Sequence, residues 1–361
     1  MENKVRVGVL GATGFVGQRL VTLLDSHPYF DVTVLGASPR SAGKTYQEVA
    51  GGKWKLSTPM PDYVKNIVVR DLHDINGIKD DVDFVFCAVD MKKDEIKAIE
   101  EAYAKAEVPV VSNNSANRMT KDVPVVVPEI NADHLEIIKA QRKRLGTKKG
   151  FIIAKPNCSI QSYVPPLTAL LEFKPTKILV STYQAISGAG KTFKDWPEMN
   201  DNVIPFIGGE EEKSEVEPLK VWGKVEGDEI KLVDDITITS QCIRVPVSDG
   251  HLATVFVSFE KKPTKEQILE KWANYKTVPQ ELGLPLAPQE FIKYFDEDNR
   301  PQTNLDRNRE NGMSISVGRL REDSIFDYKF VGLSHNTLRG AAGGAVLMAE
   351  LLYKKGYLTN N

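Results

Sequence analysis

The sequence contains few cysteines and very little net charge. Three of its 361 residues are cysteine, and Cys87, Cys158 and Cys242 lie far apart with no C-x-x-C pair. A disulfide framework or a zinc ribbon is therefore not expected, and a reduced, intracellular protein is indicated. The formal net charge of −2 at neutral pH gives no general attraction to nucleic acid or to an anionic membrane. We expect neither of these partners and no metal site.

A long hydrophobic run is also missing. No apolar stretch approaches the roughly 20 residues that a membrane-spanning helix needs. Residues 1–10 carry no apolar signal core and run directly into a predicted strand. We therefore expect a soluble, cytoplasmic chain, and its length favours two domains over one.

A glycine-rich segment follows the predicted strand 5–10 and precedes a predicted helix that ends near residue 26. Its first glycine permits a tight turn, the second lets a pyrophosphate approach the N–H groups of the helix N-terminus, and the third lets helix and strand pack closely. The segment therefore predicts a dinucleotide site. The expected cofactor-binding residues are Gly11, Thr13, Gly14, Phe15, Val16 and Gly17.

The second predicted strand ends without the acidic residue that usually holds the ribose of NAD. Ser38, Arg40 and Ser41 occupy this place. Hydroxyl groups and a cation favour the additional 2′-phosphate of NADP over NAD. An ordinary polar loop is the alternative interpretation.

Strands and helical segments alternate through the first half of the chain, which predicts a parallel, doubly wound sheet of the Rossmann type. The further strands are expected at 32–37, 67–69, 83–88 and 108–112, and a helix at 92–106. The later strands are β-branched and alternate with polar residues, which favours an α+β domain with a mostly antiparallel sheet. They are expected at 177–184, 236–240, 252–259 and 313–318.

These patterns predict two domains. Residues 1–156 would form the cofactor-binding domain, completed by the C-terminal helix 336–361, and residues 157–335 the second domain. The proline-rich stretch 279–311 is expected to be an irregular excursion. The apolar helix 336–353 contains three glycines that allow close backbone approach, so we expect it to pack on the first domain.

Cys158 opens the second domain, between a predicted strand at 151–154 and a helical run. Asn157 is a favourable N-cap, which would place the thiol near a helix N-terminus, where the dipole lowers a thiol pKa and free N–H groups stabilise an oxyanion. Pro165 and Pro166 would make this helix short or kinked. Cys87 and Cys242 lie in strand-like runs and are expected to be inert, and a buried structural thiol remains the alternative for Cys158 itself.

Acid/base and anion-binding candidates follow. His251 opens a strand after a loop and is the preferred proton-transfer residue, with His335 as second choice. Arg118, Lys213 and Arg244 are cations suited to an anionic substrate, and Arg244 suits bidentate carboxylate recognition. For Lys213, the solvated face of an acidic helix is an equally good interpretation.

Together these motifs resemble aspartate-β-semialdehyde dehydrogenase over nearly the whole chain, most closely the branch of archaea and fungi. The matching segments are 11–17, Pro156-Asn157-Cys158, 182–188, Glu210-Glu211-Glu212-Lys213, 244–251 and 335–341. The resemblance implies reduction of L-aspartyl 4-phosphate by NADPH to L-aspartate 4-semialdehyde through a thioester on the cysteine. This product feeds lysine, threonine and methionine synthesis. It also implies a catalytic and dimerisation role for the second domain, in a homodimer or homotetramer.

The resemblance also implies individual roles. Cys158 would be the nucleophile, His251 the acid/base, and Gln184 the residue that orients the intermediate. Glu210 and Arg244 would bind the amino and carboxylate ends of the substrate. The phosphate would be bound by Arg118 and Lys213, with Asn117 and Ser115 as helpers, and the cofactor also by Ser187, Gly188 and Asn336.

Two alternatives stay open at this point. A related acyl-thioester reductase, such as a malonyl-CoA reductase, uses the same plan with another acyl donor. A nucleotide-sensing or scaffold protein would retain the fold without the chemistry, but the thiol, the base and the phosphate cations are all present in this chain.

Overall fold

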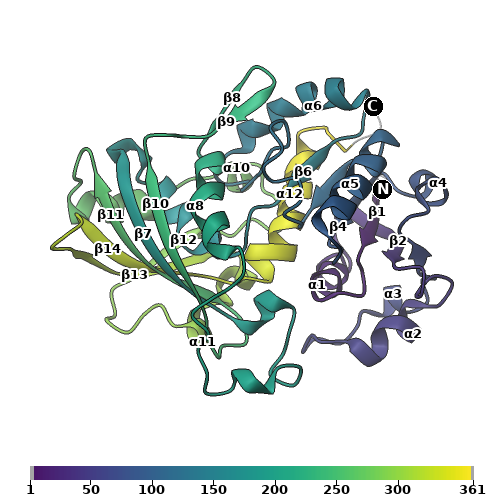
Figure 1. Cartoon of the computed structure of the whole chain (residues 1–361), viewed down its shortest axis with the longest axis horizontal. Coiled ribbons are helices and arrows are strands. Elements are labelled where there is room, and N and C mark those ends of the chain that lie inside the picture. Colours follow the sequence, from purple (N-terminus) through teal and green to yellow (C-terminus); the bar gives the residue numbers. More distant parts are fainter. Residues whose placement is uncertain (1–3, 359–361) are drawn as a thin grey trace.

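The computed structural model describes residues 4–358 and contains two large sheets, which lie at opposite sides of the molecule (Figure 1). The first sheet has six strands, all parallel, in the order β3-β2-β1-β4-β5-β6. Its strands are β1 (Val5–Leu10), β2 (Phe30–Ala37), β3 (Arg70–Asp71), β4 (Phe84–Cys87), β5 (Val110–Ser112) and β6 (Ile152–Ala154). The predicted doubly wound parallel sheet is confirmed.

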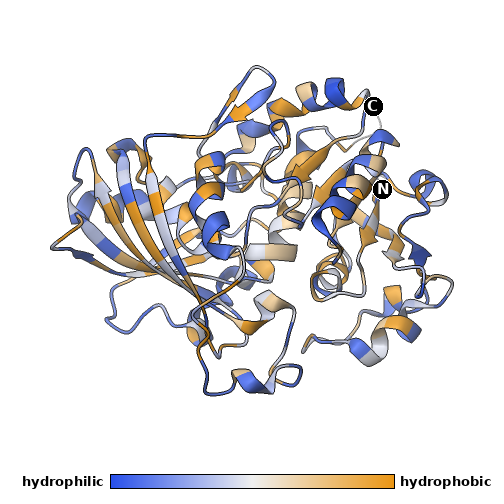
Figure 2. Cartoon of the chain, viewed as in Figure 1, coloured by the Kyte–Doolittle hydropathy of each residue, from blue (hydrophilic) through white to orange (hydrophobic). Residues whose placement is uncertain are grey.

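Alternation along the strands decides which helices cover each face of this sheet. In β4, Phe84 and Phe86 pack in the core cluster that includes α1 (Phe15–Leu23) and α12 (Gly343–Lys354). Val85 and Cys87 point the other way, into the cluster that includes α5 (Lys93–Lys105). Both faces are therefore buried, as expected of parallel strands rich in valine, isoleucine and phenylalanine. Figure 2 shows this apolar character along the strands of the sheet.

The second sheet also has six strands, in the order β10-β7-β11-β14-β13-β12. They are β7 (Pro175–Gln184), β10 (Thr237–Arg244), β11 (His251–Phe259), β12 (Ile292–Phe295), β13 (Ile315–Glu322) and β14 (Tyr328–Ser334). Neighbours are antiparallel from β7 through β11 and β14 to β13, and the two edge strands pair in parallel. Burial alternates residue by residue along β11, the expected pattern for a sheet with one face in the core.

Three further described helices have eight or more residues. They are α6 (Ile138–Leu145), α8 (Glu210–Val221) and α9 (Lys265–Ala273). A small hairpin joins β8 (Lys224–Glu226) to β9 (Glu229–Lys231). The remaining α-helices are short: α2 (Tyr46–Ala50), α3 (Asp62–Lys65), α4 (Ile75–Ile78), α7 (Val164–Thr168), α10 (Val278–Glu281) and α11 (Thr303–Asp306).

Several predicted elements were wrong. Residues 67–69 form no strand, since only an isolated bridge joins Val68 to Thr45 and β3 begins at Arg70. The predicted irregular stretch 279–311 contains β12, which extends the second sheet by pairing with β13. Strand β14 was not predicted at all. The four residues of β12 become a strand through pairing with β13, about 20 residues further along the chain, which a local pattern does not reveal.

The last helical segment returns to the first sheet as predicted. A π-helical turn, Leu338–Ala342, leads into α12, whose residues Gly343 to Leu352 are all buried. Arg339 forms a buried bidentate pair with Glu129. A Cβ on Gly340 would lie 2.7 Å from Cβ of Cys158, so the glycine allows this segment to pass directly beside the thiol. Residues 1–3 and 359–361 of the predicted domains lie outside the described residues.

Candidate active site

Cys158 and His251 are positioned by strands of two different sheets. Cys158 follows β6 and precedes the 3₁₀ helix Ser159–Ser162, while His251 is the first residue of β11. Sγ of Cys158 lies 3.4 Å from Nε2 of the fully buried His251. The backbone N–H of Ala185, just past β7, donates to Nδ1 of His251 at 3.1 Å. A neutral imidazole that accepts at Nδ1 carries its proton on Nε2, so an N–H faces the sulfur.

The local structure around Cys158 differs from the predicted capped helix. Cys158 itself is the N-cap of a four-residue 3₁₀ helix, and Oδ1 of Asn157 accepts from the N–H of Ser159 at 2.7 Å. Pro165 and Pro166 do not interrupt a helix, because they lie in the first turn of α7, where a missing N–H is tolerated. The dipole of a long helix is therefore not available to the thiol.

Charged side chains around Cys158, and not a helix dipole, influence the pKa of its thiol. Burial raises the pKa of the Cys158 thiol and the carboxylate of Glu210 adds to this rise, whereas the cations Lys155, Arg118 and Arg244 oppose it. Burial also holds the pKa of His251 well below its usual value, reinforced by Arg244. Both reacting groups therefore rest in an environment that disfavours uncompensated charge.

Cys158 lines a cavity of about 260 Å³. Its charged and polar lining consists of Arg118, Lys155, Asn157, Cys158, Gln184, Ser187, Glu210, Arg244 and Asn336, with Asn113 and Thr337. Most of the predicted substrate residues are thus brought together. Asn117 is not among them, because its buried side chain donates to Glu100 at 2.8 Å and accepts from Thr120. Lys213 does not line the cavity either, and its Nζ lies 2.8 Å from Oε1 of Glu210.

Glu210 is the acidic residue of this cavity. It is the first residue of α8 and receives hydrogen bonds from Asn157 at 3.0 Å and Gln184 at 3.3 Å, with Lys213 Nζ at 2.8 Å. Burial alone would raise the pKa of Glu210, but Lys213 and the amide donors outweigh it and lower the pKa. A buried, ionised carboxylate at this position suits an ammonium group. Its neighbour Glu211 turns away and bonds to Gln241.

Two arginines line the same cavity. Arg118 NH1 forms an ion pair with Glu217 at 2.9 Å, and its Nε has no hydrogen-bond partner. Arg244 NH1 donates to the carbonyl of Ala185 at 2.6 Å, and in the part of the chain that is described it forms no ion pair. Arg244 is therefore available to an anionic group that enters the cavity.

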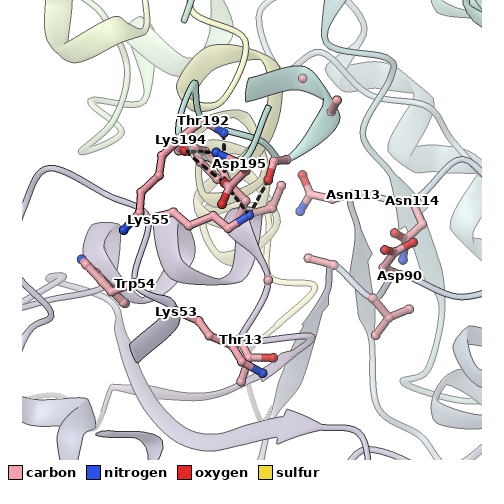
Figure 3. Close-up of a pocket in the computed structure, with 18 of the residues that line it drawn as sticks. Thr13, Lys53, Trp54, Lys55, Asp90, Asn113, Asn114, Thr192, Lys194 and Asp195 are labelled. Atoms are coloured by element: carbon pink, nitrogen blue, oxygen red, sulfur yellow. Dashed lines mark hydrogen bonds and ion pairs between the residues drawn. The ribbon is translucent and has the colours of Figure 1, made fainter. Parts of the chain in front are cut away.

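A larger cleft of about 940 Å³ lies beside this cavity. Thr13, Gly14, Phe15 and Val16 from the glycine segment line one part of it, and Val16, Asn113 and Gly188 line both spaces. Figure 3 shows Thr13 and Lys53 on one wall and Thr192, Lys194 and Asp195 on another, with Lys55 between them. Lys55 Nζ lies 3.1 Å from Asp195 and 2.8 Å from the carbonyl of Gly190.

The glycine segment fits a dinucleotide. Gly11 has φ of +81°, and a Cβ on Gly17 would lie 2.3 Å from the carbonyl oxygen of Gly11, so both glycines are required by the turn itself. A Cβ on Gly14 would meet nothing closer than 3.4 Å, and no side chain caps α1. Open space before uncapped helix N–H groups is the arrangement that binds a pyrophosphate.

Other predicted cofactor residues are distributed around these two spaces. Asn336 accepts from the N–H of Gly250 and donates to Ser187 Oγ, both at 2.8 Å, beside the thiol cavity. Ser38, Arg40 and Ser41 follow β2 outside the residues that line the cleft, so their contact with a 2′-phosphate stays a prediction. Sequence reasoning missed Lys155, Asn113 and the segment Lys53-Trp54-Lys55. Lys155 adjoins the Pro156-Asn157-Cys158 motif, whereas the others carry no motif.

The described residues contain no helix long and apolar enough to cross a membrane, and residues 4–358 hold no cluster of three or more His, Cys, Asp or Glu that would suit a metal ion.

Comparison with known proteins defines the class first. Residues 6–138 match the family model "Semialdehyde dehydrogenase, NAD binding domain", and residues 165–339 match "Semialdehyde dehydrogenase, dimerisation domain". The chain is thus an oxidoreductase of the semialdehyde dehydrogenase class.

More specifically, the chain belongs to the aspartate-semialdehyde dehydrogenase family. It is 46% identical to the aspartate-semialdehyde dehydrogenase of Schizosaccharomyces pombe, over 98% of this chain and 99% of the relative. The enzyme of the archaeon Methanothermobacter thermautotrophicus is 42% identical over 96% of this chain and 99% of its own length. A crystal structure of the Candida albicans enzyme with NADP superposes with a TM-score of 0.89 at 40% identity, covering 98% of this chain and all of that one.

Proposed function

We propose that this protein reduces L-aspartyl 4-phosphate to L-aspartate 4-semialdehyde with NADPH and releases phosphate, within lysine, threonine and methionine biosynthesis. The observation that carries the proposal is the cavity that joins the Cys158 thiol to an unpaired arginine and a buried carboxylate. In the proposed complex, Arg244 binds the α-carboxylate of the substrate and Glu210 binds its ammonium group. The acyl phosphate then lies toward Arg118, the remaining arginine of the cavity.

The chemistry proceeds in two steps on Cys158. The thiolate attacks the acyl carbon, the bond from carbon to the phosphate oxygen breaks, and phosphate leaves with the electron pair, so that a thioester remains. Bound NADPH supplies the hydride that reduces the thioester. The carbonyl then re-forms and the carbon–sulfur bond breaks, which releases the aldehyde and regenerates the thiolate.

His251 serves both steps in this proposal. Its Nε2–H, 3.4 Å from the sulfur, is the proton that the oxygen or the departing sulfur meets as negative charge develops. Gln184 donates to Glu210 and orients the bound intermediate. Lys213 acts through Glu210, whose ionised state it favours, and Asn117 supports the loop that carries Arg118.

The cofactor is proposed to bind in the larger cleft, with Gly14, Phe15 and Val16 at its pyrophosphate and Asn336, Ser187 and Gly188 toward its nicotinamide. Residues 4–156 and 336–358 would form the cofactor-binding domain and residues 157–335 the catalytic and dimerisation domain. The match to a dimerisation-domain model supports a homodimer or a homotetramer. A cytoplasmic location suits an enzyme whose three cysteines are all free.

The test is the reverse reaction, followed by the absorbance of the NADPH formed. Purified protein, L-aspartate 4-semialdehyde and NADP should produce NADPH only when phosphate is added. Formation of NADPH from malonate semialdehyde and coenzyme A, with none from aspartate semialdehyde and phosphate, would replace the proposal by a CoA-dependent reductase. Glu210 argues against that outcome, because a malonyl group has no ammonium to pair with it.

A further inference from the structure

The inward face of α8 carries polar and charged residues, although the inward face of a helix is normally apolar. Glu210, Ser214, Glu217 and Lys220 follow one another at intervals of four, three and three residues, and all of them are buried. This spacing places them on one side of the helix. Burial of a charged side chain is costly unless the charge is paired, so the partners of these residues indicate what the face does.

Glu217 joins two segments of the active site. Its Oε1 forms the ion pair with NH1 of Arg118 at 2.9 Å, and its Oε2 accepts from the backbone N–H of Asn157 at 2.6 Å. Arg118 lies in the loop after β5, and Asn157 directly precedes Cys158. One buried carboxylate therefore spans the arginine proposed for the phosphate and the residue next to the nucleophile.

These contacts need a carboxylate, because both partners of Glu217 are donors. An ionised carboxylate accepts at each oxygen, whereas a carboxamide offers one acceptor and an NH2 group. A guanidinium has five N–H groups, and Glu217 and the carbonyl of Asn113 take two of those on Arg118. The ion pair thus fixes the guanidinium and still leaves N–H groups for an anion in the cavity that Arg118 lines.

Other residues of the same face hold the same two segments. The carboxylate of Glu210 receives the side-chain N–H of Asn157 at 3.0 Å, and Nζ of Lys220 donates to the carbonyl of Arg118 at 2.7 Å. The positions of Arg118 and Asn157 therefore depend on one helix. Because Glu217 contacts both of them, it can set the spacing between them.

We propose that Glu217 is a positioning residue, which holds the phosphate-binding Arg118 at a fixed distance from the nucleophile Cys158. The acyl carbon and the phosphate of the substrate are joined through one oxygen. The spacing between thiol and guanidinium therefore decides whether both ends are engaged in the same bound geometry. This inference rests on the proposed function, for which it names the residue that aligns the phosphate with the thiol.

The first test compares the Michaelis constants of the reverse reaction in Glu217→Gln. The carboxamide loses one of the two contacts, so the KM for phosphate should rise about tenfold to a hundredfold, the effect of losing a hydrogen bond to a charged group. The KM values for aspartate semialdehyde and NADP should stay near those of the parent. A merely structural loss of folded protein would lower kcat and leave every KM unaltered. An unaltered KM for phosphate overturns the proposal.

The sign of the change separates positioning from charge compensation. If Glu217 only offset the charge of Arg118, its neutralisation would make the cavity more positive and lower the KM for phosphate. Glu217→Asp retains the charge, but its shorter side chain cannot span both partners, so it should also raise this KM. A lower KM in Glu217→Gln, or an unaltered one in Glu217→Asp, overturns the assignment.

Glu215 supplies a matched control on the same helix. Its Oε1 accepts from the backbone N–H of Ser240 at 2.9 Å, and it is not among the residues that line the cavity. Glu215→Gln should leave the KM for phosphate unchanged. An equal rise in the Glu215 and Glu217 variants would show that any hydrogen-bonded carboxylate of α8 acts through structure alone, and would overturn the assignment.

A measurement without turnover separates this inference from the proposed function. Inorganic phosphate bound at Arg118 should protect Cys158 from alkylation by iodoacetamide, because both residues line one cavity. The phosphate concentration for half-protection should rise in Glu217→Gln as the KM does. Such a rise without turnover of aspartate semialdehyde would remove the proposed function and retain this inference. Absence of protection in the parent overturns the inference, whatever the turnover.

A crystal structure of the unsubstituted protein with phosphate covers the case in which the Glu217 variants do not fold. Arg118 should contact the phosphate while its ion pair with Glu217 persists. A guanidinium that has left Glu217 to reach the phosphate overturns the proposal.

Discussion

Ninety-three residues separate Cys158 from His251 in sequence, yet Sγ and Nε2 lie 3.4 Å apart. The contact exists because β11 pairs with β7 in a register that brings the first residue of β11 beside Ala185, at the end of β7. That backbone N–H fixes which nitrogen of the imidazole carries the proton. The second sheet therefore determines the protonation chemistry available to a cysteine carried by the loop after the first sheet.

Replacing His251 by Asn should slow turnover about 10²–10⁴-fold, the usual contribution of a positioned acid/base group. The amide retains hydrogen-bonding capacity but transfers no proton at neutral pH. Steady-state rates measure the effect, with cofactor binding by fluorescence as the control for folding. A rate within a factor of two or so of the parent's would assign the role to another residue.

Replacing Glu210 by Gln should weaken recognition of the substrate's ammonium group. Loss of a hydrogen bond to a charged group costs about 1.5–3 kcal/mol, so kcat/KM should fall about tenfold to a hundredfold. The matched control is Glu212→Gln, since Glu212 is exposed on the same helix. Equal losses in both variants would show that the effect is the general acidity of α8 and not binding in the cavity.

Two glycines of the cofactor loop should respond differently to alanine. At Gly17 a Cβ would lie 2.3 Å from the carbonyl oxygen of Gly11, so Gly17→Ala should lower the free energy of unfolding by about 1–3 kcal/mol or more. Gly14 has φ of −75° and open space before it, so Gly14→Ala should change stability by no more than about 0.5 kcal/mol.

The same Gly14→Ala variant should raise the Kd for NADP, because the added methyl group enters the cleft where the pyrophosphate is proposed to lie. Urea unfolding and a fluorescence titration separate the two effects. Unaltered NADP affinity in this variant would place the pyrophosphate elsewhere.

Lys220 should make stability depend on pH. Burial lowers its pKa from 10.5 to about 8, so between these values the unfolded chain holds a proton that the folded chain has lost. Unfolding then takes up protons, and the contribution of Lys220 to stability rises with pH across this window. From pH 8 to 10 the rise should be about 1–2 kcal/mol.

Urea unfolding at both pH values, in the parent and in Lys220→Met, isolates this contribution. The parent should gain stability relative to the variant as the pH rises. A relative gain of the same size below pH 7 would contradict the assignment, because Lys220 is then protonated in both states.

Much of the fold could be predicted from local patterns. The alternating strands and helices of the first half, the glycine segment and the returning C-terminal helix all follow from periodicity and turn chemistry, and the structure contains them. Strand β12 could not be predicted, because four residues in a proline-rich stretch become a strand only through pairing with β13. The prediction at 67–69 was wrong for the converse reason, since β-branched residues there meet no strand partner beyond a single bridge.

The sequence could identify most residues of the candidate site, but it could not show how their side chains are arranged. Motifs identified Cys158, His251, Glu210 and Arg244, which the fold brings together, and also Asn117, which bonds to Glu100 away from the cavity. Lys155 adjoins one of these motifs, but nothing in the sequence shows that it is buried without a carboxylate partner. Burial and ion pairing arise from contacts distant in sequence, and they determine the pKa of a lysine.

Acylation of Cys158 is the step on which the proposed function depends. The most direct measurement incubates the protein with L-aspartyl 4-phosphate in the absence of NADPH, quenches in acid, and examines the peptides by mass spectrometry. We predict an aspartyl group on Cys158 that hydroxylamine removes, with one equivalent of phosphate released per site. Cys158→Ala should show neither and should still bind NADP. Turnover that persists in Cys158→Ala, or an acyl group found on another residue, would contradict it.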